Sequence, residues 1–157
     1  MTNTSQRNHY PVLIMGIGNI LLRDEGFGPY VIKELQKMEL PPFVELLDGG
    51  TAGVDLIDFI RDRRKVIVVD TIQADVEPGS ILRLAVSDLT GNFLRGISLH
   101  EFGVVEALSI AKQLSCAPEE VVIFGVKGED ISCGTELTEK IAKAVPKVIE
   151  LILNELS

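Results

Sequence analysis

The sequence has no long hydrophobic run and is short of cysteine and histidine, and each shortage excludes a class of protein. No apolar stretch approaches the roughly 20 residues that a membrane-spanning helix requires, so we expect no membrane association. Only two cysteines occur, Cys116 and Cys133, without CxxC spacing, and we expect them to be free thiols in a reducing compartment. Neither an HExxH pair nor a GxSxG turn is present. With only His9 and His100 available, serine or cysteine nucleophilic catalysis lacks an independently placed base.

Basic side chains are also in the minority. The chain carries 15 Lys and Arg against 23 Asp and Glu, a formal net charge of -8, which argues against nucleic acid or an anionic membrane as the main partner. Residues 1–10 are polar and lack the apolar centre of a signal peptide, so we expect a flexible leader and a cytoplasmic location. Residues 11–157 are then long enough for one domain with a hydrophobic core.

Short apolar runs alternate with amphipathic segments along this domain. Continuous apolar runs are typical of strands buried on both faces, whereas a spacing of three to four residues is typical of helices. The expected strands are Val12–Met15, Val44–Leu47, Val66–Val69, Ile81–Val86 and Val121–Val126. The expected helices are Phe27–Met38, Val54–Ile60, Val104–Leu114 and Leu137–Ile152. The pattern predicts a three-layer α/β/α sandwich around a five-stranded, mostly parallel twisted sheet. Functional residues should lie at the carboxyl ends of its strands.

A glycine-rich segment follows the first predicted strand. Gly16-x-Gly18 resembles the start of a dinucleotide-binding motif, but Leu21 occupies the place of the third glycine. The segment also delays the helix, so that no helix N-terminus lies tight against a pyrophosphate. These departures argue against nucleotide binding, and we expect no organic cofactor.

The same segment brings two adjacent carboxylates, Asp24 and Glu25, to the start of a helix. One interpretation is helix capping, with Asp24 as the N-cap residue and Glu25 as a first-turn acid, worth about 1 kcal/mol together. The other is a functional site, because the long approach through glycines exceeds what a cap requires. The residues alone leave both interpretations open.

A second glycine-rich loop, residues 48–53 (DGGTAG), follows the second predicted strand. Exposed amides and little side-chain bulk suit it to pairing with an extended peptide or to holding an anion. The same residues could also form an ordinary strand-to-helix turn in which Thr51 caps the next helix. The two interpretations are compatible.

Three further features point to one end of the sheet. Asp70 ends the third predicted strand, His100 precedes the third helix, and the fold should bring both to the same edge as Glu25. Two carboxylates and one imidazole suit a borderline divalent metal with positions left for water or substrate. Such a metal can polarise a peptide carbonyl and activate an attacking water. Taken singly, Asp70 could instead bond loop amides, and a lone histidine before a helix is more often a capping or packing residue.

In this order the segments resemble the hydrogenase maturation endopeptidases. The family opens with G-x-G-N-x-L-x-x-D-[DE]-G-x-G, which residues 16–28 (GIGNILLRDEGFG) match throughout. Its D-G-G-T-x-G loop is present at residues 48–53, and its acid at the end of a hydrophobic strand is Asp70. Its S-x-H-x-x-G-like stretch is residues 98–103. The resemblance covers nearly all of the chain after residue 11, and the four elements are specific only in combination.

The resemblance implies a monomeric endopeptidase of the M52 type. It would remove the C-terminal extension of a [NiFe]-hydrogenase large-subunit precursor once nickel has been inserted, cutting just beyond the cysteine motif that ligates the metal. The nickel would be carried by the substrate. The implied metal ligands and catalytic residues are Glu25, Asp70 and His100. The implied substrate contacts are Asn19, Asp24, Asp48, Gly49, Gly50 and Thr51.

Two points stay open at this stage. Asp24 or Asp48 could act as general base or orient the water, and the sequence does not decide between them. A non-catalytic nickel-checking module that binds the same precursor is the alternative to the protease. A spore-type protease or phosphorylase-like relative on the same fold is disfavoured by the DGGTAG loop and the single His100.

Overall fold

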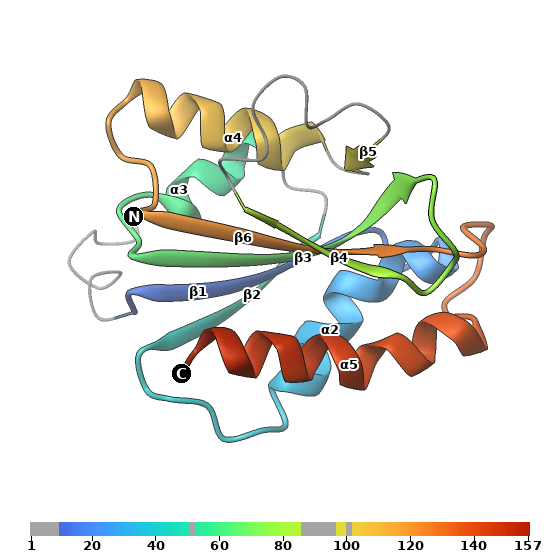
Figure 1. Ribbon diagram of the computed structural model, residues 1–157. Helices are drawn as coiled ribbons and strands as arrows, with labels where there is room; N and C mark the ends of the chain where they lie inside the picture. The colour runs from blue at the N-terminus through green and yellow to red at the C-terminus, as the bar shows by residue number, and fades with distance from the viewer. Residues whose placement is uncertain (1–9, 51–52, 86–96, 100–101) are drawn as a thin grey trace.

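A single sheet with helices on both faces forms the centre of the computed structural model (Figure 1). The structure describes residues 10–50, 53–85, 97–99 and 102–157. The strands are β1 (Val12–Ile17), β2 (Val44–Gly50), β3 (Lys65–Ala74), β4 (Ile81–Ala85), β5 (Ile97–Leu99) and β6 (Glu120–Lys127). The α-helices are α2 (Phe27–Leu35), α3 (Ile57–Ile60), α4 (Phe102–Gln113) and α5 (Glu139–Glu155), and the 3-10 helices are η1 (Arg23–Gly26) and η2 (Gly53–Leu56).

The order of the main strands is β2-β1-β3-β6-β4. The first four of these are mutually parallel, and β4 runs antiparallel to β6 at the edge. The predicted three-layer fold around five mostly parallel strands is therefore confirmed. A sixth strand, β5, pairs antiparallel with the end of β3 and was not predicted, because three residues are too few to produce a periodic pattern.

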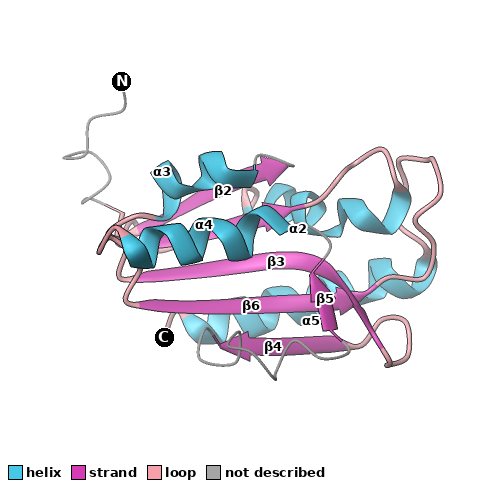
Figure 2. Cartoon of the chain, turned by 90° about the horizontal axis from the view of Figure 1, so that it is seen from above, coloured by secondary structure: helices cyan, strands magenta, loops and turns pink. Residues whose placement is uncertain are grey.

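Two apolar clusters fill the space between the layers. Helices α3 and α4 cover one face of the sheet, whereas α2 and α5 cover the other (Figure 2). Side chains alternate along β3, so that Val66 and Val68 pack on the α3/α4 side and Ile67 and Val69 on the α2/α5 side. Burial on both sides explains why these strands read as continuous apolar runs in the sequence.

The helices agree with their apolar spacing in position but are shorter in places. Helix α2 ends at Leu35 instead of Met38, and the segment predicted as one helix at 54–60 is divided between η2 and α3. Within the described residues, no helix is long and apolar enough to cross a membrane. Cys116 is buried, Cys133 is exposed and both are free thiols, as predicted.

Candidate functional site

Strands β1 and β3 separate at the carboxyl end of the sheet, and Asp70 lies at this point. The last residue pair between the two strands is Gly16 with Val69, whereas β3 continues to Ala74. Asp70 is therefore inside a strand and not at its end as predicted. Its side chain is 1% exposed, and Oδ1 accepts a hydrogen bond from the Thr71 N–H at 2.7 Å. Because the connection after β1 leads to α2 on one face of the sheet and the connection after β2 leads to α3 on the other, a ligand site is expected at this end of the sheet.

Close backbone packing places Glu25 at the same end. A Cβ on Gly18 would overlap the carbonyl oxygen of Glu25, and one on Gly28 would overlap the carbonyl oxygens of Ile17 and Val69. Only glycine permits these approaches, so η1 and the start of α2 rest directly on the ends of β1 and β3. Glu25 is 2% exposed. The glycines of the first motif thus allow the backbones of η1 and α2 to pack directly against those of β1 and β3.

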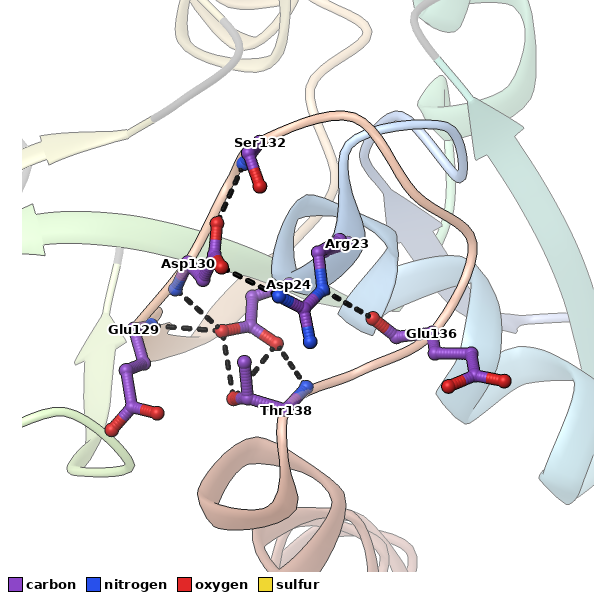
Figure 3. Close-up of polar contacts among 7 residues, drawn as sticks. All are labelled: Arg23, Asp24, Glu129, Asp130, Ser132, Glu136 and Thr138. Carbon is purple, nitrogen blue, oxygen red and sulfur yellow. Dashed lines mark hydrogen bonds and ion pairs between the residues drawn. The ribbon is translucent and has the colours of Figure 1, made fainter.

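Asp24 is turned into the protein and is anchored to the connection between β6 and α5 (Figure 3). One carboxylate oxygen, Oδ2, accepts hydrogen bonds from the backbone N–H groups of Glu129 and Asp130, each at 2.9 Å. The other, Oδ1, accepts from the N–H of Thr138 at 2.8 Å, and the Thr138 hydroxyl lies 2.9 Å from Oδ2. Asp24 is fully buried. Asp24 is therefore not an N-cap residue, since neither η1 nor α2 receives a side-chain cap, whereas Glu25 does lie in the first turn of η1.

Arg23, which is partly exposed, also binds the connection between β6 and α5. Its guanidinium pairs with Asp130 at 2.5 Å, and its Nε donates to the Glu136 carbonyl oxygen at 3.4 Å (Figure 3). Its backbone, at a φ of 47°, donates to the Gly134 carbonyl oxygen at 3.0 Å. Hydrogen bonds from Ser132 and then the charge of Arg23 lower the pKa of Asp130, so that it stays ionised. The turn before Glu25 is therefore anchored by two residues, the buried Asp24 and the partly exposed Arg23.

The second glycine-rich loop approaches the first. The Gly18 N–H donates to the Gly50 carbonyl oxygen at 3.0 Å. Asp48 is exposed, and its Oδ1 accepts from the Gly50 N–H at 3.0 Å. A Cβ on Gly49 would lie 2.6 Å from Cδ1 of Ile17, so this glycine also permits close packing. Thr51, the proposed cap, lies outside the described residues.

The remaining predicted residues are placed only in part. Asn19 is half-buried, and its Oδ1 accepts from the Leu21 N–H at 2.9 Å, which shapes the first loop. His100 lies outside the described residues. The residue before it, Leu99, pairs with Ile72, two positions after Asp70. Within the described part of the chain, no three His, Cys, Asp or Glu side chains are grouped as a metal site.

The residues that anchor Asp24 were missed by the sequence analysis. Thr138 and Glu129 lie 114 and 105 residues from Asp24, and no local pattern links segments so far apart. One sequence feature that could have pointed to this contact is Gly134, a glycine in a polar stretch before a helix. A Cβ at this position would lie 2.8 Å from Cγ of Arg23, so glycine allows Arg23 to pack closely here.

Comparison with known proteins identifies close relatives. A family model described as hydrogenase maturation protease matches residues 29–155. A candidate hydrogenase maturation protease of Methanocaldococcus jannaschii is 40% identical over 154 residues, 92% of this chain and 96% of that protein. The hydrogenase 2 maturation protease of Escherichia coli is 32% identical over 144 residues, 90% and 88% of the two chains. The solved structure of the hydrogenase maturating endopeptidase HybD from E. coli matches with a TM-score of 0.83 at 29% identity, over 92% and 91%.

Proposed function

The chain belongs to the hydrogenase maturation protease family, and from this membership we propose that it removes the C-terminal extension of a [NiFe]-hydrogenase large-subunit precursor. The observation that carries the proposal is the pair of buried carboxylates, Glu25 and Asp70, presented by separate segments where β1 and β3 diverge. Both family motifs with glycines meet at this place through the hydrogen bond between Gly18 and Gly50.

Glu25, Asp70 and His100 are proposed to bind the nickel that the precursor carries. Carboxylate and imidazole groups suit this borderline metal. Carboxylates removed from water attract a cation more strongly than exposed ones, because the local dielectric constant is lower. Leu99 next to Ile72 brings the chain to the neighbourhood of Asp70 one residue before His100. Binding to the substrate's nickel would restrict cleavage to precursors that have received this metal.

Peptide hydrolysis would then take place beside the bound metal centre. The nickel would polarise the scissile carbonyl while a water molecule adds to its carbon, after which the C–N bond would break and the leaving amine would take up the proton removed from the water. We assign the activation of this water to Asp48, which is exposed, whereas Asp24 is fully buried and already accepts several hydrogen bonds. A base must reach the attacking water, and the environment of Asp24 favours Asp48 for that role.

Mass spectrometry of a cognate precursor, incubated with this protein before and after nickel loading, tests the proposal. We expect loss of a short C-terminal peptide only from the nickel-loaded precursor. Cleavage of both forms would retain the endopeptidase but contradict recognition of the substrate's nickel. Binding without a change in substrate mass would favour the non-catalytic nickel-checking module, which the family membership disfavours.

A further inference from the structure

A cleft of about 440 Å³ opens beside the proposed catalytic centre, between α2 and the loop that leads into α5. Tyr30 and Lys33 of α2 line it, together with Asp48 at the end of β2 and Leu137 before α5. We infer that this cleft is the subsite for the C-terminal extension of the precursor, bound as a short peptide with an apolar side chain and a carboxylate. The inference rests on the proposed function and assigns a place to the leaving segment.

The position of the cleft fits a segment adjacent to the scissile bond. Gly26, the residue after Glu25, lines the cleft, and so does Asp48, which we propose to activate water. One end of the cleft therefore adjoins the centre. Its volume lies within the range of roughly 300–1,000 Å³ that is typical of ligand pockets, which suits a few residues of chain and excludes a folded domain.

The topology of the substrate decides which segment enters. Residues before the scissile bond belong to the folded large subunit, where they carry the nickel. Only the residues after the bond form a free chain end. The cleft next to the centre would therefore receive the chain end that follows the scissile bond.

Exposed apolar side chains provide the first recognition element. Ile20 and Tyr30, which both line the cleft, are 57% and 44% exposed, and Leu137 adds apolar surface to the opposite wall. Exposed apolar side chains that cluster at a concave surface are characteristic of a binding site. An apolar side chain of the extension would remove them from water.

Lys33 provides the second element. The chain as a whole is acidic, with a net charge of -8, yet the cleft contains two cations, Arg23 and Lys33. The guanidinium of Arg23 is engaged by Asp130. Among the described residues, no carboxylate lies within ion-pair distance of Lys33. Lys33 is thus available for a carboxylate of the extension, either an acidic side chain or the chain terminus.

Cleavage kinetics with two charge-reversal variants test the inference. Lys33→Glu should raise KM for the nickel-loaded precursor about fivefold and leave kcat within about twofold, because one exposed ion pair with the extension is lost. Lys147→Glu is the matched control, since Lys147 is exposed on α5, does not line the cleft and makes the same change in net charge. Equal KM values for the two variants would overturn the inference.

Direct binding separates this inference from the proposed function. A synthetic peptide with the sequence of the extension is titrated into the ¹⁵N-labelled full-length protein, and amide shifts are followed by NMR. We expect the largest shifts at Ile20, Tyr30 and Leu137, and weaker binding to Lys33→Glu. Shifts confined to other surfaces, or none at millimolar peptide, would overturn the subsite. Failure to cleave the nickel-loaded precursor while the peptide binds the cleft would refute the protease but retain the subsite.

Discussion

The N–H of Thr138 donates to Oδ1 of Asp24 at 2.8 Å, although the two residues are 114 positions apart. Thr138 is the N-cap residue of α5, so this bond joins the turn after β1 to the start of the last helix. Glu25 is the next residue after Asp24. Two consecutive acids therefore have different roles, since Asp24 holds the turn in place and Glu25 is the proposed metal ligand.

Loss of this anchor should destabilise the protein. We expect Asp24→Ala to lower the free energy of unfolding by about 3 kcal/mol, because the buried donor on Thr138 and the partly buried donors on Glu129 and Asp130 lose their acceptor. Asp130→Asn, which weakens a partly exposed ion pair, should cost much less. Denaturant titration measures both, and equal losses would contradict the anchoring role.

The proposed ligands should be needed for processing but not for folding. Glu25→Gln, Asp70→Asn and His100→Ala should each reduce precursor cleavage by about 100-fold or more, because metal binding next to the scissile bond is lost. The amide substitutions preserve side-chain volume, so the thermal unfolding midpoint should stay close to that of the wild type. Asp58→Asn, at an exposed position of α3, is the control and should process normally. Full processing by any one variant would remove that residue from the centre.

Glycine packing can be tested by adding one methyl group. Gly28→Ala should cost at least about 3 kcal/mol, because its Cβ meets two backbone carbonyl oxygens that cannot move independently. The Cβ of Gly79→Ala meets only the Lys140 carbonyl oxygen, at an ordinary contact distance of 3.8 Å, and the variant is strained only by a φ of 90°, so it should cost about 1–2 kcal/mol and leave processing intact. Thermal unfolding and the cleavage assay together distinguish them. A mild effect of Gly28→Ala would show that α2 can move away from the sheet.

Stability should depend on pH through Glu155, the last residue of α5. The hydrogen bond from Arg83, followed by that from Lys65, lowers the pKa of Glu155 below its usual 4.5. A lowered pKa in the folded state means that ionised Glu155 stabilises the protein above pH 4.5, and that this contribution disappears as the pH falls through the folded-state pKa.

The difference between wild type and Glu155→Gln measures this contribution. It should be about 1–2 kcal/mol at pH 7 and shrink as the pH drops below the usual pKa of glutamate. Glu150→Gln, on an exposed face of the same helix, should show no such dependence. A difference that stayed constant down to pH 3 would assign the effect of Glu155 to packing.

Much of the fold could be predicted because burial on both faces leaves a clear pattern. Val12–Met15, Val66–Val69 and Val121–Val126 are buried strands, and parallel strands covered by helices require such runs, whereas β2 and β4 at the edges of the sheet are only partly buried. The same topology predicted that Asp70 and Glu25 lie toward one end of the sheet, where the proposed site is located. That Asp70 lies within β3 could not be foreseen, because the strand continues through a polar stretch that is stabilised by pairing with β5 and β6.

The division of roles between Asp24 and Glu25 could not be predicted. Adjacent acids in a short turn look equivalent in the sequence, and which of them points inward depends on the geometry of η1. The donors that select Asp24 come from residues more than a hundred positions later. Only the tertiary fold brings them together, so local propensity carries no information about the choice.

The anchoring of η1 by the segment before α5 has a consequence for biosynthesis. The ribosome releases the chain from its N-terminus, so Asp24 emerges long before Glu129 and Thr138 exist. Until those residues are made, the turn that carries Glu25 lacks the hydrogen bonds that anchor Asp24. An incomplete chain, or one cleaved before the last helix, would therefore contain the proposed catalytic acids without their folded arrangement. The nascent protein should have no protease activity until α5 has folded.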